Sequence, residues 1–308
     1  MSAPTIAILS PGVMGAAVGA RLFRSGCTVL TTLAGRSPAT HKRAADAGMR
    51  DASLRDIVGN ASWILSILPP RDAVKTAEDI RDAVGKTKPT DKLVFVDCNA
   101  VSPETTKRIA ALLHGTNVRF VDAGIIGGPP KEGYDPAFYA SASDTAALDE
   151  FEELGKQWGL RVIPLRGEGV GVGDASALKM SYAGITKGTI GLYATMVLAA
   201  HASSPATAAA LMNELGMSQL PQLTRLTNSV PGMVPKAYRW IAEMEEIGAF
   251  VGPPGTEGDI YRGLARLYER IERAVDEKEK DEADGDVQVL DDFVQRAKKL
   301  LEEKNNAK

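Results

Sequence analysis

The stretch Thr5-Ile6-Ala7-Ile8-Leu9-Ser10-Pro11-Gly12-Val13-Met14-Gly15 decides the fold of the first half of the chain. It opens as a short apolar, β-prone run and continues into residues with helical periodicity. Its Ser-x-Gly-x-x-Gly pattern has Ser10 where a phosphate-binding turn usually has its first glycine. Gly12 permits close approach of a diphosphate to the backbone, and Gly15 permits close helix–strand packing. The stretch therefore predicts a strand, a tight turn and a helix whose N–H groups face a phosphate.

The same turn also occurs as a plain strand-to-helix connection, so its context has to decide between the two interpretations. Further β-rich runs follow it, separated by amphipathic stretches: Cys27–Leu33, Trp63–Leu68, Leu93–Asp97, Arg119–Asp122, Phe138–Ala142 and Arg161–Leu165. Apolar strands that alternate with helices are typical of a parallel sheet covered on both faces. We therefore expect an α/β Rossmann domain over residues 1–172, with a mostly parallel, doubly wound sheet that binds a dinucleotide.

The second half of the chain has no strand pattern after about Gly167. One long helix is predicted from Asp174 to about His201. Shorter helices are expected at Ala206–Leu215, Gln219–Asn228, Pro235–Phe250 and Glu257–Ala274, separated by breaks at Val230-Pro231-Gly232 and Gly252–Gly255. We therefore expect an all-α substrate and dimerisation domain over residues 173–275, joined to the first domain by the long interdomain helix.

The C-terminal residues 276–308 are expected to hold a charged linker and a final helix. Asp276–Asp286 is mainly acidic and lacks apolar periodicity, which favours a solvated linker or a frayed helix. Val289, Phe293 and Ala297 then recur at helical spacing. A stripe this narrow predicts a helix that docks on the body of the protein or on a second subunit.

Composition and charge exclude several classes of function. The 308 residues exceed the usual size of one domain, and the formal net charge of −3 disfavours a nucleic-acid partner. Cys27 and Cys98 lie in apolar runs, which predicts buried free thiols and no metal site. The apolar stretch Gly188–Ala200 is shorter than the roughly 20 residues of a membrane span. With no signal peptide at the N-terminus, we expect a cytoplasmic protein without a membrane partner.

The end of the second β-rich run indicates which dinucleotide is bound. NAD-binding domains usually carry Asp or Glu there, and this run continues without an acid into Gly35-Arg36-Ser37. Arg36 is suited to stack on adenine and pair with a 2′-phosphate, while Ser37 and Thr40 offer hydroxyl donors. This pattern favours NADP(H) over NAD. The alternative is that Arg36 lies exposed in a surface loop and takes no part in cofactor binding.

Several ordered segments together resemble the β-hydroxyacid dehydrogenase and 6-phosphogluconate dehydrogenase superfamily. In the first half they are Ser10–Gly15, Gly35–Ser37, Leu68–Pro70, Asp97–Asn99 with Ser102-Pro103, Asp122–Gly128, and Gly171–Gly173 with Lys179. The second half is similar to an uncharacterised branch with a phosphogluconate-dehydrogenase-like C-terminal domain. That likeness rests on Ala175–Ala183, Thr186–Gly188, Pro231–Met233, Pro235–Trp240 and Glu243–Glu245.

The resemblance implies roles for individual residues. The implied cofactor-binding residues are Ser10, Pro11, Gly12, Val13, Met14, Gly15, Arg36, Ser37, Thr40, Leu68, Pro69, Pro70 and Asn99. Among them, Pro69 and Asn99 would lie near the nicotinamide. Lys179 matches the lysine that serves the family as general acid/base, and proton transfer by a positioned lysine is established chemistry. The alternative for Lys179 is a lysine whose stem packs on the interdomain helix while its amine reaches solvent.

Two positions depart from the family pattern, and both bear on the substrate. The substrate loop Gly124-Ile125-Ile126-Gly127 has Ile126 where the family has a carboxylate-binding serine, and Ala183 replaces an asparagine after the lysine. An apolar or aromatic carbonyl compound or an imine fits this loop better than a 3-hydroxy acid. Tyr182 and Lys187 share a helix face with Lys179, so Tyr182 is a second catalytic candidate and Lys187 a substrate-binding one.

The later helices offer further candidates whose interpretation stays open. Trp240 is a substrate-binding candidate, but its spacing with Met244 and Ile247 also suits core packing. Lys236, Arg239 and Glu243 either complete a partner subunit's pocket in a homodimer or form an exposed charged face.

The sequence as a whole favours an NADP-dependent dehydrogenase or reductase acting on a small carbonyl or hydroxy compound. Hydride would pass between the nicotinamide and a substrate carbon while Lys179 moves the proton. The alternatives are imine reduction and a catalytically silent NADP-binding regulator. The first is motivated by the altered substrate loop, and the second by the missing serine and asparagine.

Overall fold

The computed structural model describes residues 3–87, 93–278 and 285–306. It divides into two compact units, Met1–Ser181 and Tyr182–Lys308. The division falls within helix α7 (Asp174–Ser203), the long helix that the sequence predicts. The domain boundary expected between residues 172 and 173 stays a prediction.

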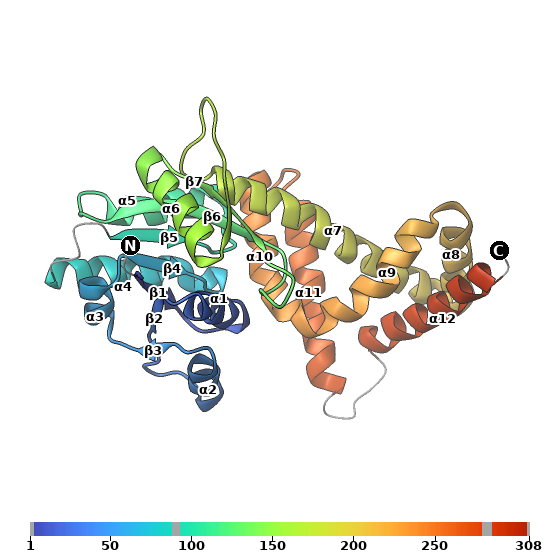
Figure 1. Cartoon of the computed structure of the whole chain (residues 1–308). Coiled ribbons are helices and arrows are strands. Elements are labelled where there is room, and N and C mark those ends of the chain that lie inside the picture. The colour runs from blue at the N-terminus through green and yellow to red at the C-terminus, as the bar shows by residue number, and fades with distance from the viewer. Residues whose placement is uncertain (1–2, 88–92, 279–284, 307–308) are drawn as a thin grey trace. The chain divides into compact units, whose positions relative to one another are not determined.

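The first unit is built on an eight-stranded sheet with the order β3-β2-β1-β4-β5-β6-β7-β8 (Figure 1). All neighbouring strands run parallel except β6 and β7, which are antiparallel. The strands are β1 (Thr5–Leu9), β2 (Thr28–Thr31), β3 (Arg50–Asp51), β4 (Trp63–Ser66), β5 (Val94–Asp97), β6 (Arg119–Ile126), β7 (Ala137–Ser141) and β8 (Arg161–Pro164). The expected doubly wound α/β architecture is confirmed. Its strand order reverses between β1 and β4, where such sheets bind ligands at the strands' carboxyl ends.

The six helices that connect these strands begin at recognisable sequence signals. They are α1 (Val13–Arg24), α2 (Pro38–Asp46), α3 (Leu54–Asn60), α4 (Pro70–Lys86), α5 (Pro103–Leu113) and α6 (Thr145–Trp158). Ser37, Ser53, Ser102 and Asp144 cap α2, α3, α5 and α6 by accepting from backbone N–H groups of the first turn. Proline opens α2, α4 and α5, where its missing N–H has no cost.

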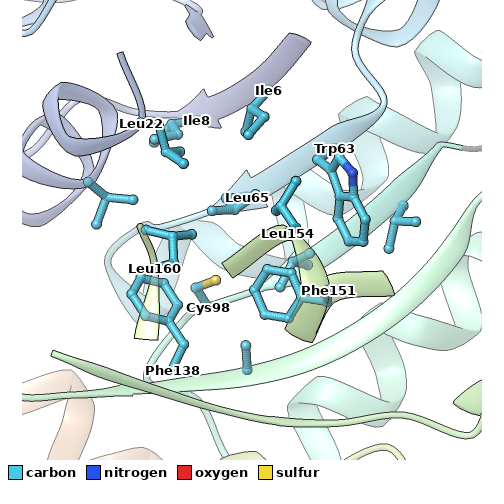
Figure 2. Packing of buried hydrophobic residues seen from close by; sticks show 14 of the residues in the cluster. Ile6, Ile8, Leu22, Trp63, Leu65, Cys98, Phe138, Phe151, Leu154 and Leu160 are labelled. Carbon is cyan, nitrogen blue, oxygen red and sulfur yellow. The ribbon is translucent and has the colours of Figure 1, made fainter. Parts of the chain in front are cut away.

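Two hydrophobic cores cover the two faces of the sheet because successive strand residues point to opposite sides. Ile6 and Ile8 of β1 belong to one core, and Ala7 and Leu9 belong to the other. Figure 2 shows the first core, in which the ring of Trp63 lies 5.6 Å from that of Phe151. The two cysteines are buried and unbonded, as the sequence predicts, and burial raises the pKa of the Cys27 thiol to about 11.

A buried carboxylate fastens the first turn of α7 to the sheet. Asp122, at the middle of β6, accepts hydrogen bonds from the backbone N–H groups of Gly173 and Ser176, each at 3.0 Å. It also accepts from the hydroxyls of Ser176 at 2.7 Å and Ser141 at 3.3 Å. Burial raises the pKa of Asp122, and these hydrogen bonds act in the opposite direction. Because its donors lie on α7, the loop before it and β7, Asp122 sets where the helix starts.

The second unit is helical throughout its described residues, as the sequence predicts. After the end of α7 it contains α8 (Pro205–Ser218), α9 (Leu220–Met233), the 3₁₀ turn η1 (Val234–Lys236), α10 (Ala237–Val251), α11 (Asp259–Lys278) and α12 (Asp286–Asn306). The helix expected near the C-terminus is confirmed as α12, which packs against α8 and α9 of the same chain (Figure 1). Phe293 and Ala297 of its apolar stripe are buried there.

Two details of the secondary structure differ from the prediction. The break expected at Val230-Pro231-Gly232 is absent, because α9 continues through Pro231 to Met233. Val230 and Met233 are both buried, so their packing offsets the backbone hydrogen bond that proline cannot make. The two-residue strand β3 was not expected, since Arg50 and Asp51 are exposed and carry no strand pattern. Most of the predicted charged linker, residues 279–284, lies outside the described residues.

Candidate functional site

The turn between β1 and α1 has the geometry of a phosphate-binding loop. Ser10 adopts a left-handed conformation with φ of 66°, the conformation for which glycine is preferred. The N–H of Gly12 donates to the Ser10 carbonyl at 2.9 Å. A Cβ on Gly15 would lie 2.7 Å from that same carbonyl oxygen, so the close turn requires glycine at position 15. The serine in place of the first glycine therefore leaves the turn intact at a cost of about 1–2 kcal/mol.

The first turn of α1 is open to an anion. Gly12 precedes this helix without a side-chain cap, in contrast to the capped N-termini of α2, α3, α5 and α6. Among the described residues, nothing lies within 4 Å of the position that a Cβ on Gly12 would occupy. Uncapped N–H groups, the helix dipole and this empty space fit the diphosphate of a dinucleotide.

An arginine that the sequence interpretation missed lies beside this turn. Arg43, on α2, donates to the carbonyl of Pro11 at 3.1 Å. Thr40 and Arg43 are three residues apart on the same helix, so helical spacing was the available signal. The contact places a guanidinium next to the candidate phosphate loop.

The loop after β2 gathers the three residues expected at a 2′-phosphate. Ser37 caps α2 and shares a hydrogen bond of 3.1 Å with the Thr40 hydroxyl, while Arg36 is exposed. The structure also brings an acid to this place, which the sequence interpretation did not foresee. Asp51 of β3 accepts a hydrogen bond of 2.9 Å from the N–H of Leu33. This carboxylate lies beside the end of β2 because β3 pairs with β2.

The turn after β4 is held by a buried asparagine. The side-chain oxygen of Asn99 accepts from the N–H of Leu68 at 2.7 Å, and its amide nitrogen donates to Ser66 at 2.9 Å and to Asp97. Asn99 is only 2% exposed. Its place beside the nicotinamide stays a prediction. The amide of Asn99 joins the ends of β4 and β5. It therefore positions the turn that leads into Pro69 and Pro70.

The expected substrate loop differs from the prediction, because Gly124, Ile125 and Ile126 form the end of strand β6 and only Gly127 follows it. Lys179 lies against this strand end. The ammonium of Lys179 donates to the carbonyl of Ile125 at 2.7 Å. A Cβ on Gly124 would lie 2.9 Å from the Ala175 carbonyl and 2.9 Å from Cβ of Lys179. The helix can therefore approach the strand this closely only because residue 124 is glycine. Ile126 follows as a half-buried apolar side chain.

The two candidates on α7 in the helical unit differ in burial: Tyr182 is partly exposed, and Lys187 is largely buried. Tyr182 is about half exposed, and Thr186 donates to the backbone carbonyl of Tyr182 at 2.8 Å. Lys187 forms a largely buried ion pair with Glu243 and lies 5.1 Å from the centre of the Trp240 ring. A glutamate partner and an aromatic face both stabilise the ammonium of Lys187.

Trp240 is also engaged within this unit. Its ring meets the Tyr268 ring edge-on at 5.2 Å, and the Tyr268 hydroxyl donates to the Lys187 carbonyl at 2.6 Å. Burial raises the pKa of Tyr268 well above its usual range. The cluster joins α7, α10 and α11, which suits the core-packing interpretation of Trp240.

The described part of the chain offers no cluster of three or more His, Cys, Asp or Glu side chains that could hold a metal ion. No helix within the described ranges is both long and apolar enough to span a bilayer.

Comparison with protein families identifies the class to which this fold and site belong. Residues 5–165 match the NAD binding domain of 6-phosphogluconate dehydrogenase, and the chain belongs to that family. Residues 202–271 match a domain of unknown function, DUF1932. The family accounts for the open glycine turn and the doubly wound sheet, and it supports an NAD(P)-type dinucleotide as the ligand.

Individual relatives point in the same direction. The chain is 27% identical over 128 residues to the mitochondrial 3-hydroxyisobutyrate dehydrogenase of Drosophila melanogaster, covering 42% of this chain and 38% of that protein's length. The conserved protein MTH1747, of unknown function and structurally similar to 3-hydroxyacid dehydrogenases, superposes with a TM-score of 0.63 at 26% identity. That match covers 87% of this chain and 97% of MTH1747.

A third match shows the fold alone. The 3-hydroxyisobutyrate dehydrogenase of Mycobacterium tuberculosis, solved with L-serine, has a TM-score of 0.62 and 18% identity, covering 94% of this chain and 99% of that one. The resemblance inferred from the sequence and the expected fold class are thus confirmed.

A matched pair of glycine variants tests the cofactor turn. Gly12→Ala should leave the melting temperature of the unliganded protein unchanged, since its Cβ would meet open space. The same Cβ would obstruct the diphosphate, so we expect dinucleotide affinity to fall about tenfold or more. Gly15→Ala should instead lower the melting temperature, because its Cβ collides with the backbone of Ser10. Scanning calorimetry and dinucleotide titration of both variants measure these effects. Unchanged affinity in Gly12→Ala would remove the turn from the binding site.

Proposed function

We propose that this chain is an NADP(H)-dependent oxidoreductase that interconverts a small carbonyl compound and its hydroxy form, with Lys179 as the general acid/base. The observation that carries this proposal is the 2.7 Å contact between the Lys179 ammonium and the Ile125 carbonyl. This contact holds a proton donor against the carboxyl-terminal end of β6. Catalytic groups of such folds are found at that end of the strands.

The chemistry divides between the cofactor and the protein. When bound, the nicotinamide supplies the hydride to the carbonyl carbon in reduction and accepts it in oxidation. Lys179 gives a proton to the substrate oxygen in the first direction and takes it back in the second. One hydride and one proton therefore convert C=O into CH–OH. The open turn at Gly12 would hold the diphosphate, and Asn99 keeps the turn at Leu68 in place.

The preference for NADP(H) rests on the charges around the loop after β2. Arg36 is exposed there, with the hydroxyls of Ser37 and Thr40 beside it. Arginine is the side chain best suited to a 2′-phosphate because its planar fork matches phosphate oxygens. The carboxylate of Asp51 is engaged by the N–H of Leu33, which compensates part of its charge. Arg43 adds a further positive charge near the phosphate loop.

The altered substrate loop favours imine reduction as a second candidate function. Ile126 brings an apolar side chain to the position of a carboxylate-binding serine, and a neutral cyclic imine needs no such serine. In that reaction, hydride adds to the imine carbon and Lys179 protonates the nitrogen. A third alternative is a silent NADP-binding regulator. Detection of hydride transfer to any aldehyde, hydroxy acid or cyclic imine would exclude it.

We also propose that the helical unit forms a homodimer through α7. Tyr182, Ile185, Leu192 and Met196 of this helix are 49%, 66%, 58% and 52% exposed. Their spacing of three, seven and four residues places them along one face of the helix. Large apolar side chains in such a row are unfavourable in water, and a second copy of the same helix would cover them.

A prediction about turnover concerns Lys179. Lys179→Met should lower turnover by about 100-fold or more, because it removes the proton donor and keeps a similar stem. NADPH affinity should stay nearly unchanged. The matched control is Lys156→Met, which removes an exposed lysine of α6 and should leave turnover unaltered. Steady-state kinetics against a panel of aldehydes and cyclic imines measure both, and full turnover in Lys179→Met would refute the assigned role.

Another prediction concerns the choice of nucleotide. Arg36→Ala should weaken NADPH binding about tenfold or more, the usual effect of losing a charge-assisted contact. NADH binding should change by less than about twofold, since that nucleotide lacks the 2′-phosphate. Calorimetric titration with both nucleotides gives the two constants, with Arg24→Ala on the exposed end of α1 as control. Equal losses for NADPH and NADH would contradict the proposal.

A further prediction concerns assembly. Light scattering at micromolar concentration should give twice the chain mass for the wild type. Ile185→Glu and Leu192→Glu should each give the monomer mass, because a buried unpaired carboxylate opposes association. Met217→Glu, at an equally exposed apolar residue of α8, should leave the dimer intact. A monomeric wild type would rule the dimer out.

A further inference from the structure

The loop between β6 and β7 contains a hydrogen bond that changes what its backbone offers to a ligand. The N–H of Gly128 donates to the hydroxyl oxygen of Tyr134 at 3.1 Å. Gly128 lies three residues after Ile125, whose carbonyl accepts from Lys179. The tyrosine hydroxyl therefore contacts the backbone three residues along the chain from the carbonyl that Lys179 contacts.

The loop is built to hold this hydroxyl. Gly127 has φ of 131°, and a Cβ there would lie 2.2 Å from the Tyr134 hydroxyl oxygen. Only glycine therefore leaves the space that the hydroxyl fills. Lys131 and Tyr134 exchange two backbone hydrogen bonds of 3.0 Å, which close the turn beneath the ring.

The residue after the tyrosine is anchored to α1. Asp135 pairs with Arg21 at 2.8 Å, and Arg21 also donates to the carbonyl of Gly159 at 3.1 Å. The backbone of Tyr134 is thus held by the Lys131 turn on one side and by the Asp135 ion pair on the other. This double attachment fixes the base of an otherwise exposed side chain.

The chemical consequence concerns carboxylates. An exposed backbone N–H is a good partner for a carboxylate, because hydrogen bonds to charged acceptors are the strong ones. In this chain the Gly128 N–H is already used by Tyr134, and the preceding Ile126 contributes no polar group. The Tyr134 oxygen accepts from Gly128 and keeps one proton to donate. A single O–H donor suits the oxygen of a neutral carbonyl group or the nitrogen of an imine.

We propose that Tyr134 is a specificity-determining residue: its hydroxyl occupies the Gly128 amide, so that this amide does not bind a carboxylate, and it donates instead to a neutral carbonyl or imine substrate. The substrate class named here rests on the proposed oxidoreductase function. Ile126 and Tyr134 act in the same direction, since one removes a polar donor from the loop and the other occupies an amide. The loop therefore offers no site for a carboxylate. It offers the Tyr134 hydroxyl as one donor for an uncharged carbonyl oxygen or imine nitrogen.

The experiment uses the full chain loaded with NADPH and titrates it with malonate, a small dicarboxylate. Wild-type protein should bind malonate weakly. Tyr134→Phe, which removes the hydroxyl, should bind malonate about five- to tenfold more tightly, and Tyr134→Ala at least as tightly because it also clears the ring. Tyr193→Phe, in the helical unit, is the control and should match the wild type. Unchanged or weaker malonate binding in both Tyr134 variants would overturn the proposal.

A kinetic arm tests the donor half of the proposal. The probes are 4-oxobutanoate and its methyl ester, which differ in charge. Wild-type kcat/KM should favour the ester, and Tyr134→Phe should lower the ester-to-acid ratio about tenfold by raising KM for the ester. A merely structural role would weaken both probes together and leave the ratio unchanged, which would refute the donor role. The malonate titration needs no turnover, so failure of the enzymatic proposal alone is recognised when malonate binding tightens while neither probe is reduced.

Discussion

The open N-terminus of α1 is the feature on which the rest of this site depends. A helix start without a side-chain cap leaves donors unsatisfied, and here the glycine turn also keeps the space in front of them empty. Such an arrangement is stabilised when an anion supplies the missing acceptors. Ser10 tolerates a left-handed conformation to keep this geometry, which shows how strongly the turn constrains its residues.

A second close approach, at the end of β6, positions Lys179, the proposed acid/base. Gly124 lets α7 contact the strand, and Asp122 fastens the first turn of that helix from within the sheet. Lys179 follows one turn later and reaches Ile125. A buried carboxylate and a missing side chain thus combine to direct one ammonium group. The neighbouring loop, with Ile126 and the Tyr134–Gly128 contact, then decides which substrates can approach it.

Much of this arrangement could be predicted from local patterns. The glycine turn, the mostly parallel doubly wound sheet and the helical second half follow from periodicity and motif spacing. Pro231 was misleading because buried neighbours keep α9 helical beyond it. Asp51 and Arg43 were missed because their importance comes from contacts with Leu33 and Pro11, which are distant in sequence. The hydrogen bonds of the Asn99 amide between two strand ends were also not foreseen, and its place beside a ligand stays a prediction.

The sequence by itself determined the class of fold, the dinucleotide turn and the identity of Lys179 as a candidate, because each depends on residues close together along the chain. Only the tertiary structure decided which polar groups remain available to a ligand. The pairing of Lys187 with Glu243, of Leu33 with Asp51 and of Gly128 with Tyr134 depends on how distant or looped segments meet. Tertiary packing decides which partner each polar group bonds to, and a group that is already bonded is not available to a ligand. No local sequence pattern encodes that partner.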